Sequence, residues 1–254
     1  MKRHFFYTIF FILIVGTSFA QRKKNLYTAT GENAIYKNEW SIGARLHTNG
    51  FSAFYERVWV KNIWKKSVLQ TDFFYYKDYR ESKTDVSPAL STSNRTYIYG
   101  KQNNFFQFKL GYGQRKIIAN KMDQKGVRFS WFYMGGVSLG LLKPYHLEIK
   151  KDNESSFYAY GEIPDDVFLS IDSNNAVLGA GGVQYGFNKL KPLPSIYGKF
   201  GFNFDWANKE YFVKALEVGV QLDVFYKKLP IMITSRNKPY ILNFYMSIQM
   251  GKRW

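Results

Sequence analysis

Alternation of apolar and polar residues with a period of two runs through much of this 254-residue chain and limits its fold more than any other feature. Within residues 214–224 every second residue from 216 onwards is aliphatic, and every second residue is apolar over 240–250. This period places alternate side chains on opposite faces of a β-strand, so both segments are predicted strands. The same alternation predicts strands over residues 40–47, 51–60, 67–77, 104–112, 127–141, 177–187 and 196–205.

The polar face of these strands separates a membrane barrel from a soluble sandwich. A soluble sandwich exposes mainly long polar residues, whereas here the polar face carries Gly, Ser, Asn and Gln with single charges of both signs, which suits a narrow polar lumen. A closed barrel also pairs every backbone group in lipid, and an open sheet does not. We therefore predict an all-β fold, a closed antiparallel transmembrane β-barrel, with a secreted β-sandwich or a periplasmic β-protein as the alternative. Aromatic residues near the strand ends, as at a membrane interface, are Trp40, Tyr112, Tyr185 and Tyr240.

The predicted barrel has eight to ten strands, and ten is preferred. Nine strands are recognisable in the sequence, and single-chain bacterial barrels have an even number. The candidates for a tenth strand are residues 156–162 and 27–36. The pair Gly135-Gly136 could instead divide one long strand into a hairpin, but the apolar phase continues through it, which favours a single strand.

Two dipeptides predict details of the first hairpin. Asn49-Gly50 is a strong signal for a tight turn between residues 40–47 and 51–60. Glu56-Arg57 interrupts the apolar phase of the second of these segments, which predicts a bulge or a strand end there.

The start of the chain has the pattern of a secretory signal. A short basic stretch precedes an apolar run over residues 5–15, and small residues lead to a predicted cleavage between Ala20 and Gln21. A membrane anchor is the alternative, but this run is too short to span about 30 Å of hydrocarbon as a helix. The predicted organisation is a cleaved signal over 1–20 and a single barrel domain over 21–254.

The charge of the chain limits its partners. The formal net charge is +17, and cleavage of the signal leaves 34 basic and 19 acidic residues, or +15. Export to the envelope argues against a nucleic-acid partner, and the absence of Cys excludes disulfides and thiolate chemistry. The basic residues lie mainly in the predicted connections, where they either bind lipid phosphates, including those of lipopolysaccharide, or form a solvated rim. These basic stretches are 22–24, 61–66, 115–125, 189–191 and 227–228.

The longest predicted connections are residues 80–101 and 143–175, and long connections of such barrels face out of the cell. The second is the acidic one, and the sequence assigns it no role.

Charged residues at lumen-facing positions allow two interpretations. In a narrow barrel they pair into an ion network that fills the interior, because unpaired charges in a confined space are costly. The alternative is a selective pore, and the plug is preferred because eight to ten strands leave little more room than side chains occupy. The predicted lumen charges are Arg45, Asp72, Lys109, Arg128, Lys199, Asp205, Glu217 and Asp223.

Catalytic signals are weak. His146 with Asp165 or Asp166 could serve a hydrolase or a lipid-modifying enzyme, but the chain has neither a G-x-S-x-G nor an H-E-x-x-H motif. The other histidine of the mature chain, His47, lies beside the predicted Asn49-Gly50 turn. Residues 165–166 and 172–175 could bind Ca²⁺, although no EF-hand pattern is present. We predict no enzymatic activity, no cofactor and no metal site.

The end of the chain fits an outer-membrane barrel. Trp254 lies in phase with the apolar face of residues 240–250, and outer-membrane barrels commonly end on an aromatic residue that the barrel-assembly machinery recognises. Lys252 departs from this pattern, because an apolar residue is usual at its position. The predicted C-terminal assembly signal comprises Phe244, Met246, Ile248, Met250 and Trp254.

Residues 100–106, 135–145 and 251–254 are similar to stretches in uncharacterised small outer-membrane β-barrel proteins of Bacteroidota, and the mature chain resembles that group in layout. The resemblance implies a fold and a place in the outer membrane of a Gram-negative bacterium, and no catalytic residue. We expect a monomer with a structural or interaction role in the cell envelope. The alternatives are a narrow pore or transport or secretion accessory, and a barrel-embedded enzyme.

Overall fold

The computed structural model describes most of the chain from Tyr36 to Trp254. The described residues are 36–62, 64–85, 96–121, 126–151, 154–159, 175–182, 184–209, 211–233 and 237–254. The predicted signal, its cleavage between Ala20 and Gln21, and most of the candidate strand over 27–36 lie outside the described residues.

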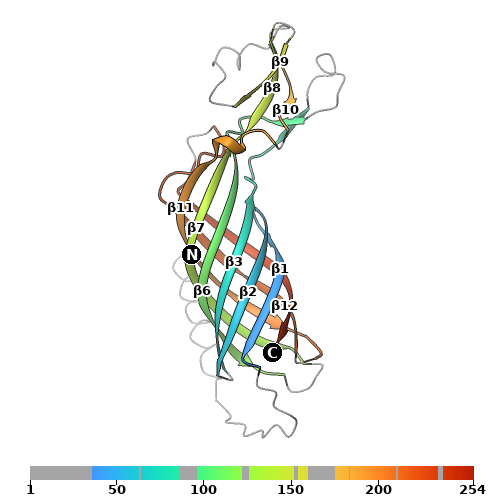
Figure 1. Ribbon diagram of the computed structural model, residues 1–254, viewed down its shortest axis with the longest axis vertical. Helices are drawn as coiled ribbons and strands as arrows, with labels where there is room; N and C mark the ends of the chain where they lie inside the picture. The colour runs from blue at the N-terminus through green and yellow to red at the C-terminus, as the bar shows by residue number, and fades with distance from the viewer. Residues whose placement is uncertain are drawn as a thin grey trace, which may run out of the picture. The chain divides into compact units, whose positions relative to one another are not determined.

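Eight antiparallel strands close into a barrel (Figure 1). The first strand pairs with the last as well as with the second, so each strand of the ring has a partner on both sides. The alternative of a β-sandwich is therefore wrong. The barrel strands are β1 (Asn38–His47), β2 (Gly50–Asn62), β3 (Lys65–Tyr76), β6 (Asn103–Ala119), β7 (Arg128–Pro144), β11 (Lys191–Asp205), β12 (Phe212–Phe225) and β13 (Tyr240–Arg253).

The preferred count of ten strands is wrong, because eight of the nine predicted strands form the barrel and the ninth does not. The segment predicted over 177–187 contributes β10 (Asn175–Ala180), which pairs with β8 (His146–Lys151) in a separate sheet. The third strand of that sheet is β9 (Glu154–Ala159), from the candidate segment 156–162. These strands have six residues each, whereas crossing a membrane takes about 9–11.

A turn ends the Gly-rich segment that was predicted as a strand. Gly186 has φ of 91°, a left-handed conformation that glycine adopts without strain, and the short 3-10 helix η2 (Phe187–Lys189) follows it. Two further short strands, β4 (Lys83–Asp85) and β5 (Thr96–Ile98), pair with each other.

The interpretation of Gly135-Gly136 as part of one strand is confirmed, because β7 runs through the pair and Gly136 pairs with Gly111 on one side and Tyr197 on the other. The prediction of a bulge or a strand end at Glu56-Arg57 is wrong, because β2 continues to Asn62. The pairing of β2 is regular there, and its register shifts only between Val60 and Asn62. The apolar phase only looked broken, because β2 also points apolar side chains, Phe54 and Val58, into the lumen.

The barrel has its apolar face outside and its polar face inside, as the alternation predicts. Leu46 and Phe244 on the outer face are 66% and 62% exposed, whereas Arg45 on the inner face is 1% exposed. A soluble β-protein has the opposite arrangement, because water favours the burial of apolar area.

The connections divide between the two ends of the barrel. The backbone amides of Lys37 and Asn38 donate hydrogen bonds to the carbonyl of Trp254, at 3.1 and 3.0 Å, which brings both ends of the described chain together. We call this the lower end. Because the strands alternate in direction, the described residues of the connections 63–64, 120–127 and 206–211 also lie there, and those of 48–49, 77–102, 145–190 and 226–239 lie at the upper end.

Apolar side chains close the upper end of the lumen. The connection between β12 and β13 crosses to the start of β6, where the amides of Gln102 and Asn103 donate to the carbonyl of Ile231 at 2.8 and 3.2 Å. It brings Leu229, Ile231 and Met232 against a buried cluster from the strands. The strand residues of this cluster are Phe74, Tyr76, Phe105, Leu142, Leu193, Phe225 and Ile241.

Within the described residues, no helix has the length and apolar character needed to cross a membrane.

Two glycines on neighbouring strands test how closely the barrel wall is packed. A Cβ added to Gly136 would lie 2.1 Å from the backbone oxygen of Leu110, whereas a Cβ at Gly198 would meet no atom within 4 Å. We expect Gly136→Val to lower the free energy of unfolding by about 1–3 kcal/mol and Gly198→Val to leave it nearly unchanged. Urea unfolding in detergent micelles measures both, and equal losses would contradict this account of the packing.

Candidate functional site in the barrel lumen

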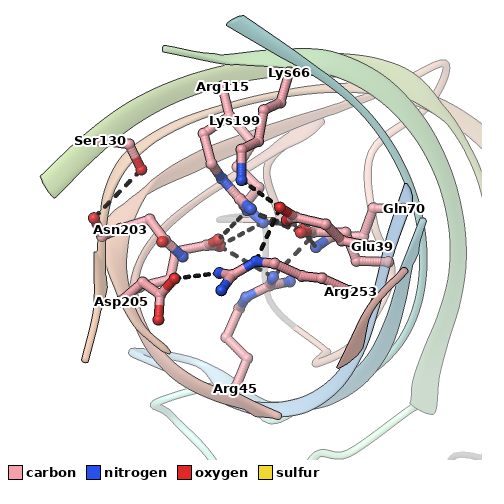
Figure 2. Close-up of polar contacts among 12 residues, drawn as sticks. Glu39, Arg45, Lys66, Gln70, Arg115, Ser130, Lys199, Asn203, Asp205 and Arg253 are labelled. Atoms are coloured by element: carbon pink, nitrogen blue, oxygen red, sulfur yellow. Dashed lines mark hydrogen bonds and ion pairs between the residues drawn. The ribbon is translucent and has the colours of Figure 1, made fainter. Parts of the chain in front are cut away.

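Glu217 on β12 is the centre of the charged lumen. Its side chain has no exposure to solvent. Lys199 Nζ on β11 lies 2.7 Å and Arg45 Nη2 on β1 lies 3.3 Å from Glu217 Oε1. Arg115 Nη2 on β6 lies 3.7 Å from Glu217 Oε2. Figure 2 shows the three basic side chains reaching inward from different parts of the barrel wall. One carboxylate therefore holds together strands that are far apart in the sequence.

The same network continues through Arg45 and Gln70. Arg45 also forms an ion pair with Asp72 on β3, and its guanidinium carbon lies 4.2 Å from the ring centroid of Phe54. Gln70 Oε1 accepts a hydrogen bond from Lys199 Nζ at 2.9 Å, and Gln70 Nε2 donates one to Glu56 at 3.2 Å. Glu56 in turn lies 2.9 Å from Arg115, so the central charges form one connected set.

A second group of charges lies at the lower end of the lumen. Glu39 on β1 pairs with Lys66 and with Arg253, whose Nε lies 3.0 Å from Glu39 Oε1. Arg253 also pairs with Asp205 on β11, as Figure 2 shows, and Arg128 Nη1 approaches the same carboxylate at 3.7 Å. These contacts join the first strand to the last across the seam at which the barrel closes.

A third group lies towards the upper end. Lys109 Nζ on β6 contacts both carboxylate oxygens of Asp223 on β12, at 2.9 and 3.0 Å. Gln107 Nε2 lies 3.0 Å from Asp223 Oδ1 and donates to Ser138 Oγ at 2.8 Å, and Gln221 donates to the other oxygen of Asp223. The apolar cluster that closes the upper end includes Phe74, whose ring centroid lies 4.6 Å from Lys109 Nζ.

All the lumen charges that the sequence predicts take part in these groups. Arg45, Asp72, Lys199 and Glu217 lie in the central group, Arg128 and Asp205 in the lower group, and Lys109 and Asp223 in the upper group.

Five further members were missed in the sequence. The predicted strands were a few residues too short at one end, so Lys66, Arg115 and Arg253 were assigned to connections or left out. The signal was present, because each continues the period of two of its strand: Arg253, for example, is in step with Ser247 and Gln249. The missed residues are Glu39, Glu56, Lys66, Arg115 and Arg253.

The buried lumen charges balance. Within the described residues, six buried carboxylates face six buried basic groups in the lumen. A cavity of ≈ 10 Å³ at the lower end, bordered by Glu39, Lys66 and Arg253 among others, has room for about one water molecule. The carboxylates are Glu39, Glu56, Asp72, Asp205, Glu217 and Asp223, and the basic groups are Arg45, Lys66, Lys109, Arg115, Lys199 and Arg253.

The two histidines lie in different environments. His47 is buried in the upper lumen, with Nε2 3.1 Å from Ser52 Oγ and its ring against Phe74. His146 begins β8, and its Nδ1 lies 3.1 Å from the carbonyl oxygen of Pro144. Within the described part of the chain, neither imidazole has a carboxylate partner. Asp165, Asp166 and the candidate Ca²⁺ segment 172–174 lie outside the described residues, and Asn175 begins β10.

The predicted C-terminal assembly signal lies on the outer face of β13 and at its end. Trp254 pairs through its backbone with Asn38, and the guanidinium carbon of Arg57 lies 4.4 Å from its ring centroid. Lys252 is exposed on the same face. Recognition by the assembly machinery stays a prediction. The exposed side chains of the predicted signal are Phe244, Met246, Ile248, Met250 and Trp254.

Fold and lumen together define a class of protein: a closed, eight-stranded antiparallel β-barrel with an apolar exterior and an ion-paired interior. No family model matches the sequence, and no curated protein matches it.

The solved structures to which the chain is similar include small outer-membrane barrels. Ail, the attachment invasion locus protein of Yersinia pestis, has 10% identity and a TM-score of 0.42, over 86% of this chain and 99% of that one. Neisserial surface protein A has 8% identity and a TM-score of 0.40, over 85% and 96%. The N-terminal β-barrel domain of Pseudomonas aeruginosa OprF has 7% identity and a TM-score of 0.36, also over 85% and 96%. At these identities no residue's role carries over.

The central network predicts a coupled effect on stability. Glu217→Gln leaves buried cations without their shared partner, and we expect it to lower the free energy of unfolding by about 3–5 kcal/mol. Lys199→Met on the same background restores the balance of charge. We expect the double variant to lose less than the sum of the two single losses, as urea unfolding of the refolded barrels measures. Additive losses would mean that Lys199 and Glu217 do not interact.

Proposed function

We propose that the chain is an outer-membrane β-barrel of a Gram-negative bacterium, with a plugged lumen and a structural or interaction role in the cell envelope. In this proposal it spans the membrane as a monomer, with the lower end in the periplasm and the upper connections outside the cell. The affiliation with Bacteroidota rests on the sequence resemblance alone.

The observation that carries the proposal is the apolar outer face of the ring. Large apolar side chains on the outer face of every barrel strand are exposed or half-buried. Each Å² of apolar area left in water costs about 25 cal/mol, and soluble monomers rarely expose contiguous apolar patches beyond a few hundred Å². Hydrocarbon is the medium in which such a surface is stable, and the barrel strands have 10 to 17 residues, enough to cross it.

The plugged lumen favours interaction over transport. Paired charges fill its middle and lower part, and the cluster around Phe105 and Ile231 closes its upper end. The upper connections, in contrast, contain an ordered sheet with its own apolar core, formed by Tyr145, Leu147 and Ile149. An ordered surface of this kind supports a role in contacts outside the membrane.

Cell fractionation tests the location. We expect the mature chain in the outer-membrane fraction, and we expect the folded form to migrate faster than the boiled form on detergent gels, because a closed barrel stays compact. A soluble periplasmic chain with no difference between boiled and unboiled samples would contradict the proposal.

Bilayer recordings test the plug. We expect purified protein inserted into a planar bilayer to show no steady single-channel conductance, because ion pairs and an apolar cluster block the lumen. A general diffusion porin recorded in the same bilayer is the positive control. Steady unitary currents that scale with the amount of inserted protein would favour the alternative of a narrow pore.

A further inference from the structure

Exposed lysines gather at the upper ends of three neighbouring barrel strands. Lys191 begins β11, Lys227 and Lys228 follow β12, and Lys238 precedes β13. Backbone hydrogen bonds hold these ends together: the amide of Leu229 donates to the carbonyl of Lys238 at 3.2 Å. We call these four residues the lysine rim.

Among the described residues, the lysine rim forms no ion pair with a carboxylate. The sequence contains no Asp or Glu over residues 173–204 or 224–254. The described part of the chain places no carboxylate within ion-pair distance of the four ammonium groups. The acidic groups described at the upper end lie in the β3–β6 connection, where Arg80 pairs with Asp78 at 2.7 Å and Lys101 with Glu81 at 2.8 Å. Arg80 also donates a hydrogen bond to Asn237 Oδ1 at 3.4 Å, so this already paired group adjoins the residue before Lys238. Within the described residues, the four ammonium groups of the lysine rim are therefore not neutralised by ion pairs, whereas the neighbouring carboxylates of Asp78 and Glu81 already have basic partners.

The lysine rim directly adjoins the apolar outer face. Tyr226 is 77% exposed, and the amide of the residue before it, Phe225, donates to the carbonyl of Pro239, which places Tyr226 beside the start of β13. Lys227 Nζ lies 5.2 Å from the ring centroid of Tyr226, and Lys238 Nζ lies 5.4 Å from that of Tyr240. Tyr side chains beside an apolar belt mark the level of lipid headgroups, where lysines place their charge in the polar layer.

We propose that the lysine rim binds the phosphate groups of a phosphorylated lipid in the outer leaflet. Ammonium groups beside an apolar wall match an anion that carries its own hydrocarbon chains, and the exposed Ile196, Val224 and Leu242 below the rim offer those chains a surface. This proposal rests on the proposed outer-membrane location. It adds a lipid class, a bisphosphorylated glycolipid such as lipid A, and confines its site to one side of the barrel.

Binding of labelled lipid A to the purified barrel in neutral detergent micelles tests the proposal. The test variant is Lys227→Gln with Lys228→Gln. The matched control is Lys77→Gln with Lys83→Gln, which removes the same charge from exposed positions in the β3–β6 connection. Each lysine near a lipid surface contributes roughly fivefold to binding, so we expect the test variant to lose at least about tenfold and the control to stay within about twofold. We expect lipid A without phosphates to bind as weakly as the test variant.

Two outcomes would overturn the proposal. Equal losses of lipid A binding in both double variants would indicate general charge attraction. Full competition by millimolar inorganic phosphate would indicate a site for the free anion. The gel-shift assay on the same samples separates failure of the lysine rim from failure of the outer-membrane proposal. Variants that keep the compact fold but bind lipid like the wild type refute the lysine rim alone. A wild-type chain that is soluble and unshifted refutes the outer-membrane proposal itself.

Discussion

Glu217 holds a negative charge where no solvent reaches it, and basic side chains from β1, β6 and β11 approach it within 3.7 Å. Removal of Glu217 would leave the buried ammonium of Lys199 without a carboxylate partner among the described residues, which is far more costly than the net gain from a paired group. The buried charges of the lumen therefore balance one another, and their pairing requires the strands to close in one register. A shift of one residue along any strand would turn its charged set to the outside and its apolar set to the lumen.

The rest of the structure is consistent with this constraint. Arg253 and Glu39 link the last strand to the first at the lower end, where the barrel closes. At the upper end the interior changes from polar to apolar, and the β12–β13 connection contributes Ile231 and Met232 to the closure. In the proposed function, contacts are made by the two surfaces outside the lumen: the outer wall with the lysine rim, and the sheet of β8, β9 and β10 in the upper connections.

Period-two alternation was enough to predict the barrel and the inward face of its charges, because a strand that separates lipid from a polar lumen must repeat that difference at every second residue. The alternation led to wrong predictions where strand length, turns or contacts between connections decide the structure. The strands β8, β9 and β10 alternate too, but their short length and the turn at Gly186 place them outside the ring. Lys66 and Arg115 looked like parts of basic connections, since the pattern does not show how far a strand extends beyond its apolar residues. The closure by Ile231 has no periodic signal, because it depends on a contact between distant connections.

The central claim is that the outer wall faces hydrocarbon while the interior is sealed from water. The chain has no Cys, so single-cysteine variants can be spin-labelled without background. Labels at Phe244→Cys, Met246→Cys and Ile248→Cys follow the outer face of β13 through the proposed bilayer. In reconstituted vesicles we expect all three labels to collide with dissolved oxygen. We expect the labels nearest the middle of the bilayer to be protected from a water-soluble nickel complex. Collision with the nickel complex at all three positions would contradict the central claim.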